Sequence, residues 1–519
     1  MRSKPRLFAF SHICSQSYIT GAEKLLLFML KELLPYFNCT LVVPNTGYLS
    51  THAEQAGVAI IVQPIPISVP LYLAQEHLMD ELHAFRSHSD YAALVQLLAE
   101  QRPDVVLVST SVHPMPAIAA KELGIPVVWM LMETIRLTPH TSASVALIER
   151  YSDWIVGISE STLQPLKMFI PHQAHRMMLL PPSWHIDALR PAAWLANREN
   201  RRNRLGIKHQ HKLIGFIASS IYENKGFIPY IKMSIEIAAR HPNAMFLIVG
   251  NPVDRPLFES GIDMVRQAGM LDRFRWVQFE DRIETIYPAF DLLVVPSLTA
   301  EGFGLTALEG LIFKKPVVAF AAGGLAEIMA ATGNAVNAVP VGDIGGLIAR
   351  VDALLHSGDL YIIGENNAHA VDLAYGLTAY RIKLFRLLEL LRANEVRVPH
   401  LVRGSGPTIY LLDGGILRPF RSEAAVIEAG YSLDQVLEID DATIHALPKD
   451  EPIGRLELPS AAQRPATSAS KNRSRSRRRR QGARTRGGKK RSGQSRGRST
   501  ARRTSGTARK HSVRRKRRS

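Results

Sequence analysis

Short apolar runs alternate with helical patterns along most of this 519-residue chain. A continuous apolar run of about four to eight residues is typical of a strand buried on both faces of a parallel sheet. Helical segments of about 10 to 15 residues separate these runs, and this alternation predicts βαβ units. Because the pattern restarts near residue 196, we predict two Rossmann-like, doubly wound α/β domains facing a cleft.

The first predicted domain covers residues 1–195. A helix is expected from Ala22 to Leu34, where apolar residues recur with a helical period. Ligands of doubly wound domains bind outside the carboxyl ends of the strands, so this edge of the sheet should face the cleft. The predicted strands are Arg6–Ile13, Cys39–Val43, Ile60–Val62, Val105–Ser109, Val127–Met132 and Trp154–Ile158.

The second predicted domain covers residues 196–377 and follows a polar stretch, Trp194–Arg204, which suits a linker or a bridging helix. A closing amphipathic helix, Thr378–Glu395, is expected within the segment 378–397. The predicted strands are Leu213–Ala218, Met245–Gly250, Arg275–Phe279, Asp291–Pro296 and Pro316–Ala321. The predicted helices are Phe227–Arg240, Asp254–Ala268, Ile283–Ala289 and Leu305–Phe313.

A small α+β unit is predicted over residues 408–457. A short strand, Thr408–Leu412, leads into a tight turn at Asp413-Gly414-Gly415, and Ile416–Pro419 returns. This unit resembles a small module attached to bacterial cell-surface proteins, through Tyr410, Gly415, Arg418, Pro419 and Gly430-Tyr431. The alternative is a structural appendage without a binding role.

The net charge of +18 comes from the C-terminal end of the chain. Residues 464–519 hold 24 of the 64 basic side chains and no acidic one, which leaves 40 basic against 46 acidic residues elsewhere. Residues 458–519 are almost free of apolar side chains, so we predict a disordered Arg/Lys/Ser/Gly-rich tail. Its favoured partner is an anionic membrane surface or polymer, and the alternatives are nucleic acid or no defined partner.

Cysteine use and hydropathy predict the compartment. Two cysteines, Cys14 and Cys39, cannot form a disulfide framework and are expected to be buried apolar residues. The apolar run at the start, Leu7–Phe10, is too short for a signal-peptide core, and no run approaches the length of about 18 residues that spans a membrane. We therefore expect a cytoplasmic protein, peripheral at the inner face of the plasma membrane if the tail binds lipid.

The strongest local signal runs from Glu301 to Glu309. It follows a predicted strand and opens a helix, so Glu301 should lie on a loop and Glu309 within the helix. Gly302 and Gly304 allow a ligand to approach the backbone, and the first-turn amides near Leu305 favour anionic or hydroxyl-rich ligands. The alternative is a capped helix with two solvated acids.

Three further turns join a predicted strand to a helix. Ser219, Ser220 and Lys225 follow the first strand of the second domain, where hydroxyls and a point charge suit a diphosphate. Thr20-Gly21-Ala22-Glu23 opens the first long helix, and Ala322–Glu327 is another glycine-rich turn. Each is also compatible with an ordinary solvated turn or helix start.

These four segments together resemble the retaining, nucleotide-sugar-dependent glycosyltransferases of the GT-B fold, family 4 (glycosyl transferases group 1). Glu301 and Glu309 match the Glu-x7-Glu pattern of that family. Residues 153–160 match a segment near the end of its first domain. The resemblance runs from about Leu7 to Glu395 and is strongest over residues 213–350.

The resemblance implies a role for each matched residue. Glu301 would contact the donor sugar and Glu309 the ribose hydroxyls, while Lys225 would neutralise the departing diphosphate. Gly21 would lie close to the diphosphate and the acceptor. The remaining donor-side residues implied are Ser219, Ser220, Gly302, and the backbone amides of Phe303, Gly304 and Leu305.

The activity implied is transfer of a sugar, with retention, from a nucleoside-diphosphate sugar to a glycan, lipid-linked or cell-envelope acceptor. No His/Cys ligand set or Asp-x-Asp motif is visible in the sequence, so no metal or other cofactor is expected. Two positions depart from the family: Ser220 stands where an Arg is common, and Met132 where a His is common, with Glu133 left for the acceptor side. The alternative is an inactive GT-B-like scaffold, or a protein that binds nucleic acid or an anionic polymer through its tail.

Overall fold

The computed structural model describes residues 4–16, 18–278, 280, 282–393, 400–413, 416–433, 436–438 and 441–454. The chain divides into two units, Met1–Leu456 and Glu457–Ser519. The predicted tail over 458–519, the turn at Gly414-Gly415 and the last part of the predicted closing helix lie outside the described residues. Everything below concerns the first unit.

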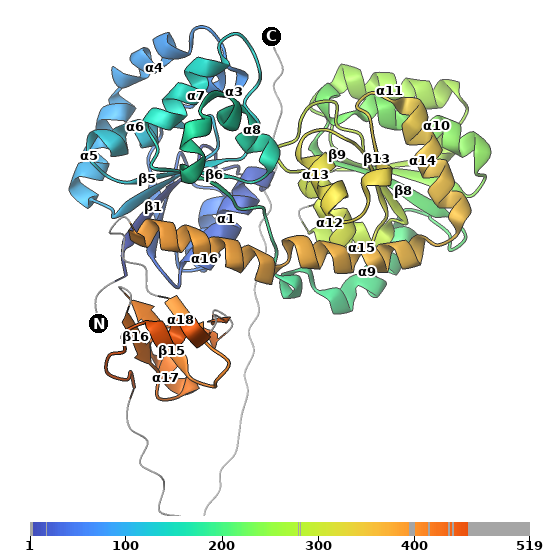
Figure 1. The fold of residues 1–519 in the computed structure, drawn as a ribbon. Coiled ribbons are helices and arrows are strands. Elements are labelled where there is room, and N and C mark those ends of the chain that lie inside the picture. The colour runs from blue at the N-terminus through green and yellow to red at the C-terminus, as the bar shows by residue number, and fades with distance from the viewer. Residues whose placement is uncertain are drawn as a thin grey trace, which may run out of the picture. The chain divides into compact units, whose positions relative to one another are not determined.

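The first lobe is built on a seven-stranded parallel sheet in the order β3-β2-β1-β4-β5-β6-β7, with helices on both faces (Figure 1). Its strands are β1 (Arg6–Phe10), β2 (Asn38–Val43), β3 (Ala59–Val62), β4 (Val105–Ser109), β5 (Val127–Leu131), β6 (Trp154–Gly157) and β7 (Met177–Leu179). Its α-helices are α1 (Gly21–Leu33), α2 (Tyr48–Gln55), α3 (Val69–Leu73), α4 (Leu78–Arg86), α5 (Ser89–Gln101), α6 (Pro114–Glu122), α7 (Thr141–Arg150) and α8 (Glu160–Phe169).

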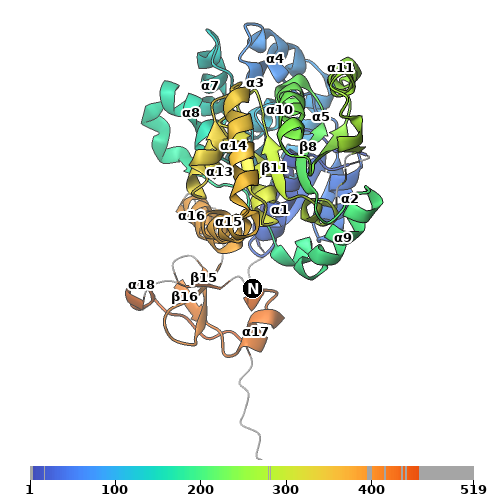
Figure 2. The ribbon, with the colours of Figure 1, turned by 90° about the vertical axis from the view of Figure 1, so that its right-hand side faces the viewer.

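The second lobe is built on a six-stranded parallel sheet in the order β10-β9-β8-β11-β12-β13. Its helices α10 (Phe227–Arg240) and α14 (Ile344–Ser357) pack against each other over this sheet (Figure 2). The strands are β8 (Lys212–Ser220), β9 (Ala244–Asn251), β10 (Phe274–Val277), β11 (Leu292–Val295), β12 (Val317–Phe320) and β13 (Ala338–Val339). The helices are α10 (Phe227–Arg240), α11 (Arg255–Gln267), α12 (Leu305–Ile312), α13 (Gly324–Ala331) and α14 (Ile344–Ser357).

The first six strands of each lobe have the same order, and the first lobe adds β7 at one edge, which confirms the prediction of two doubly wound α/β domains. In each sheet the order reverses between its first and fourth strands, β1 and β4 in one and β8 and β11 in the other. The central strands β4, β5, β6, β11 and β12 are buried along their whole length, as their continuous apolar runs predict. Cys14 and Cys39 are free and buried, also as predicted.

One predicted helix of the second domain is wrong. Residues Ile283–Ala289 form two short 3-10 turns, η6 (Ile283–Thr285) and η7 (Tyr287–Ala289), instead of one α-helix. Pro288 explains the difference, because proline disfavours helical geometry in the residue before it and has no amide to donate. The turns bring Tyr287 into the core, where it is fully buried.

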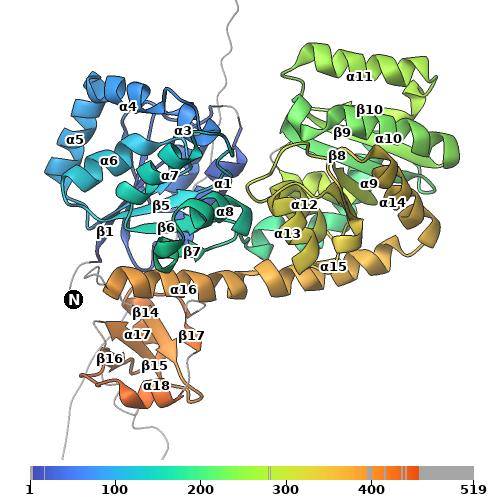
Figure 3. The same cartoon turned by 45° about the horizontal axis from the view of Figure 1, so that its top comes forward.

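Three helices join the lobes. The bridging helix α9 (Trp194–Arg204) forms where the polar stretch was predicted, and Arg198 and Arg202 bind Asp291 of the second lobe. Helix α15 (Leu360–Tyr375) packs on α12, and α16 (Leu377–Ala393) continues along the first lobe (Figure 3). There Arg381 Nε lies 2.7 Å from Glu32 Oε2 of α1. The chain thus returns to its first lobe after completing the second.

A small unit follows α16. Its four-stranded sheet has the order β16-β15-β14-β17, with β15 antiparallel to both of its neighbours. The strands are β14 (His400–Arg403), β15 (Ile409–Asp413), β16 (Ile416–Pro419) and β17 (Leu437–Glu438), with helices α17 (Glu423–Glu428) and α18 (Asp441–Ala446). Within the described part of the chain, no helix is both long and apolar enough to cross a membrane.

Candidate functional site

The carboxyl ends of the two parallel sheets meet at a cleft lined by both lobes. This is the edge where doubly wound domains bind ligands. The first lobe contributes Gly21, Lys24, Met132, Glu133 and Ile158 to its walls. The second contributes Ser219, Lys225, Glu280, Tyr287, Ser297, Glu309 and the segment from Glu301 to Thr306, among others.

Glu301 and Lys225, predicted from separate motifs, bind each other. Lys225 Nζ lies 2.8 Å from Glu301 Oε1, and the Ser297 hydroxyl donates to the same oxygen at 2.7 Å. Lys225 follows β8 and Glu301 follows β11, the neighbouring strands at the point where the strand order reverses. Both side chains are partly exposed, at 35% and 22%, so the pair faces the cleft rather than the core.

The glycines of the Glu301 loop allow very close packing. A Cβ on Gly302 would lie 1.9 Å from the Met132 carbonyl oxygen of the first lobe, and Ser159 Oγ donates to the Gly302 carbonyl at 2.5 Å. Gly304 has φ of +103° and precedes α12 without a side-chain cap. The start of α12 therefore presents backbone amides at the cleft wall, next to Phe303 and Leu305.

Glu309 is held at the cleft by groups from both lobes. The Tyr287 hydroxyl donates to Glu309 Oε2 at 2.6 Å, and Lys24 Nζ of the first lobe lies 3.6 Å from Oε1. Burial and the Glu309 charge raise the pKa of Tyr287 well above its usual value, so the phenol remains a donor. Sequence reasoning missed Tyr287, which fell within the wrong helix, and Lys24, which directly follows the Thr20–Glu23 turn.

The turn at Thr20–Glu23 is both an ordinary helix start and part of the cleft wall. Thr20 and Glu23 form a capping box at the start of α1, and the buried Glu23 carboxylate also accepts from the Ser15 amide at 2.9 Å. Gly21 lines the cleft, and a Cβ there would lie 3.2 Å from Leu305 Cδ1 of the second lobe. Thr20 and Glu23 therefore shape the helix, and Gly21 faces the second lobe.

On the first lobe, buried polar groups gather where β1, β4 and β5 end. Glu133 lines the cleft and accepts from the Ser111 amide at 2.9 Å, while burial raises the pKa of its carboxyl group. Among the described residues, His12 Nδ1 and His113 Nδ1 are buried without a hydrogen-bond partner. Burial lowers the pKa of His12 to about 4, and burial together with His12 lowers that of His113 to about 3. The sequence patterns singled out neither histidine.

Two other sequence candidates have different surroundings. Ser219 lines the cleft, whereas Ser220 pairs with Asn251 at the end of β9 and is not part of the lining. Glu327, in the glycine-rich turn at 322–327, accepts from the amides of Glu160 and Ser161 at 2.8 and 2.7 Å. It therefore caps α8 of the first lobe from the second.

Comparison with known proteins gives the class of the second lobe. Residues 197–370 match the family model "Glycosyl transferases group 1". A 2-deoxystreptamine N-acetyl-D-glucosaminyltransferase of Streptomyces fradiae is 28% identical over 211 residues, 39% of this chain and 48% of the relative. A D-inositol 3-phosphate glycosyltransferase of Mycolicibacterium smegmatis is 27% identical over 209 residues, 38% of this chain and 45% of the relative. The chain spans about half the length of these curated relatives.

Solved structures resemble both lobes. Anabaena HepE in complex with UDP and glucose superposes with a TM-score of 0.60 at 18% identity, covering 74% of this chain and 99% of that one. Sucrose-phosphate synthase from Thermosynechococcus elongatus gives 0.57 at 18% identity, covering 75% and 100%. The two lobes have the GT-B fold, and residues 197–370 of the second lobe are similar to the glycosyl transferases group 1 family.

Proposed function

We propose that this protein is a glycosyltransferase that takes a sugar from a nucleoside-diphosphate donor and passes it, with retention, to an acceptor held by the first lobe. The observation that carries the proposal is the convergence of Lys225, Glu301 and the start of α12 on one cleft wall. The family match over residues 197–370 supports the same reaction class.

The charges of the second lobe suit a departing diphosphate. Negative charge grows on the leaving group during glycosyl transfer, and a cation and backbone amides already in place stabilise it without reorganising. In this proposal Lys225 and the amides of Phe303, Gly304 and Leu305 receive the phosphates, with help from Ser219. The diphosphate would draw Lys225 Nζ away from Glu301 Oε1, 2.8 Å distant, and so release Glu301 to contact the donor sugar.

Glu309 suits the ribose end of the donor. A carboxylate accepts two hydrogen bonds from neighbouring hydroxyls, as a ribose diol requires. The Tyr287 hydroxyl fixes one of its oxygens and leaves the group at the cleft wall. Lys24, on the opposite wall, would sit close to the same part of the nucleotide.

We assign the acceptor to the first lobe, at Gly21 and Glu133. Gly21 brings backbone close to Leu305, where the donor diphosphate would lie, and Glu133 offers a half-buried carboxyl group in the same cleft. A glycan or a lipid-linked envelope precursor is the proposed acceptor. The names of the curated relatives point to small cyclitols, 2-deoxystreptamine and inositol phosphate, so these form the second acceptor class to test.

The proposed reaction uses no metal or other cofactor, because Lys225 and the α12 amides supply the positive charge that the diphosphate needs. We place the enzyme in the cytoplasm, with the basic segment 464–519 attaching it to an anionic membrane surface or polymer. Nucleic acid is the less favoured partner of that segment.

An inactive scaffold is the competing function, favoured by Ser220 and Met132, which stand where related enzymes commonly have Arg and His. Ser220 pairs with Asn251 and gives the cleft no second cation. A thermal-shift screen with UDP-, GDP- and ADP-sugars separates the two proposals, because a ligand that binds the native state must raise its melting temperature. No shift with any donor would favour the scaffold.

The decisive experiment uses the best donor from that screen, with glycan, lipid-linked and cyclitol acceptors, followed by product analysis. We expect Lys225→Ala to lower kcat by about 10²–10³-fold, and Glu301→Gln to lower it as well. The matched control is Lys121→Ala, which breaks a similarly exposed ion pair with Asp153 in the first lobe. Equal turnover in all three variants and the wild type would refute the site assignment.

A further inference from the structure

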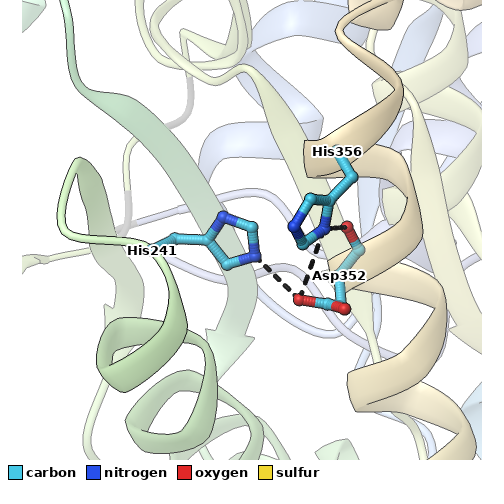
Figure 4. Close-up of side chains that lie close together, drawn as sticks. All are labelled: His241, Asp352 and His356. Carbon is cyan, nitrogen blue, oxygen red and sulfur yellow. Dashed lines mark hydrogen bonds and ion pairs between the residues drawn. The ribbon is translucent and has the colours of Figure 1, made fainter.

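Two histidines and an aspartate of the second lobe lie close together (Figure 4). His241 directly follows α10, and Asp352 and His356 sit four residues apart on the last turns of α14. In a doubly wound domain the helices run antiparallel to the strands, so their C-termini lie at the amino ends of the strands. The cluster is therefore separate from the candidate active site.

The three side chains converge on a common point. His241 Nε2 lies 2.8 Å from Asp352 Oδ1, and His356 Nδ1 lies 3.6 Å from the same oxygen. One ligand atom of each residue lies within 4.8 Å of the other two, and the imidazole centroids are 4.8 Å apart at 65°. Two separate helices thus deliver three donor groups to a space the size of a metal coordination shell.

We propose that His241, Asp352 and His356 bind a divalent transition-metal ion of the zinc class. Two imidazoles and one carboxylate form a common ligand set of Zn²⁺ in proteins, with a fourth position left for water. Mg²⁺ and Ca²⁺ prefer oxygen ligands, so this donor set disfavours them. The spacing of Asp352 and His356, four residues apart, places both ligands on one face of α14.

Hydrogen bonds already hold this cluster in place. His241 Nε2 lies 2.8 Å from Asp352 Oδ1. His356 Nδ1 lies 2.9 Å from the Asp352 carbonyl oxygen, within hydrogen-bond distance. The same Nδ1 lies 3.6 Å from Asp352 Oδ1, so a metal bound between the three side chains would take this nitrogen in its unprotonated form, in place of the backbone hydrogen bond.

The cluster is open to solvent, and the charges around it allow a cation to bind. The His241 side chain is 13% exposed and Asp352 26%, whereas His356 is 68% exposed and leaves an open approach from solvent. Arg240 is the neighbouring cation that opposes a metal, and its guanidinium lies 3.7 Å from the Glu236 carboxylate, which offsets part of its charge. Binding to neutral His241 requires its Nε2 proton to move to Nδ1 or to leave.

A metal here would connect the end of α10 to the last turn of α14, the two helices that pack together over the second sheet. An ion that binds the native state stabilises it by mass action. The inference does not rest on the proposed glycosyl transfer, because the cluster lies away from the cleft and donates to no cleft residue among those described.

The test is zinc titration of the full chain after chelator treatment and dialysis, followed by calorimetry. We expect one Zn²⁺ per chain, bound at least about tenfold more weakly in His356→Ala and in Asp352→Asn. The matched control is His369→Ala, an exposed histidine on α15 that should leave the affinity unchanged. Because His356 is largely exposed, its replacement leaves the core intact.

A second readout guards against zinc held by other histidines. Zn²⁺ should raise the melting temperature of the wild type and of His369→Ala, and raise it less in the two site variants. Mg²⁺ at the same concentration should have no such effect. If the wild type and His356→Ala take up zinc with the same stoichiometry and affinity, the cluster is a hydrogen-bonded ion pair and the proposal is wrong.

Discussion

Gly302 of the second lobe packs directly against the backbone of the first lobe. A Cβ there would lie 1.9 Å from the Met132 carbonyl oxygen, which is backbone and cannot rotate away. We predict that Gly302→Ala lowers the free energy of unfolding by about 1–3 kcal/mol through overpacking. Chemical denaturation measures the difference.

The control for this substitution is Gly345→Ala in the first turn of α14. A Cβ on Gly345 meets only Asp343 Oδ1, at 3.5 Å, and alanine is the better helix former. Its stability should be unchanged or slightly higher. A Gly302→Ala protein as stable as this control would show that the lobes separate in solution at this contact.

At the residue scale, sequence patterns predicted the groups that lie within motifs. Glu301, Lys225, Ser219 and Glu309 all line the cleft, because short strand-to-helix turns carry their side chains to the edge where the strand order reverses. Tyr287 was not predictable, because its approach to Glu309 depends on two 3-10 turns set by Pro288. The roles proposed for these residues remain predictions.

Asp291 of the second lobe binds two arginines of the bridging helix α9. Burial by itself would raise the pKa of Asp291, but Arg198, Arg202 and the Leu213 amide outweigh it and hold that pKa below its usual value. A carboxyl group with a lowered folded-state pKa stabilises the protein above its unfolded pKa of about 3.9. This contribution is lost as the pH falls through the folded-state pKa.

We therefore predict that Asp291→Asn lowers the free energy of unfolding by about 3 kcal/mol at pH 7, since it leaves two partly buried guanidinium groups without their counter-charge. The difference from the wild type should shrink as the pH falls below about 4, where Asp291 of the unfolded wild type begins to protonate while the folded protein still holds it charged. Urea denaturation at about pH 7, 4 and 3 tests this. A difference that is as large at the lowest of these pH values as at neutral pH would contradict it.

Helix α8 depends on a cap from the other lobe. Glu327 accepts from the Glu160 and Ser161 amides, and a carboxylate at a helix start satisfies free amides and opposes the helix dipole. We predict that Glu327→Ala costs about 1 kcal/mol of stability. Asp359→Ala is the control, because Asp359 precedes α15 without making a side-chain cap. If the Glu327→Ala and Asp359→Ala proteins are equally stable, water binds the two α8 amides as well as Glu327 does, and the prediction is wrong.

At the element scale, hydropathy predicted the strands well, because buried parallel strands are continuous apolar runs. It failed at Ile283–Ala289, where the apolar spacing is helical but Pro288 prevents the helix. It also could not show that Glu327 caps a helix more than 150 positions earlier, since no local pattern records a partner in another lobe.

The basic segment dominates the charge of the whole molecule. It carries 24 of the 64 basic residues and no acidic one, while the remainder is mildly acidic. We predict that the full chain cosediments with vesicles containing an anionic lipid at low salt, and that a chain ending at Gly454 does not. Screening should release the full chain as salt rises, because the Debye length falls to about 3 Å at 1 M.

Neutral vesicles and single-stranded DNA serve as the comparison arms of this experiment. Equal binding of the full chain to neutral vesicles would contradict an electrostatic attachment, and tighter binding to DNA would favour nucleic acid as the partner. Glycosyl transfer to a soluble acceptor should not differ between the two chains, because every cleft residue lies before position 310.

At the scale of the whole molecule, two α/β domains were predictable because their strand and helix patterns repeat. The proximity of His241 to Asp352 was not, because these residues are 111 positions apart and each has an ordinary helical neighbourhood. The sequence predicted α16 as an amphipathic helix, but it did not indicate that this helix packs along the first lobe.

That return has a mechanical consequence centred on Glu32 of α1. His185, on the outward passage between the lobes, lies 3.1 Å from Glu32 Oε1, and Arg381, on the return, lies 2.7 Å from Oε2. The outward and return passages are therefore both bound to one carboxylate of the first lobe. Replacing Glu32 would release both of them in a single substitution, although they are far apart in the sequence.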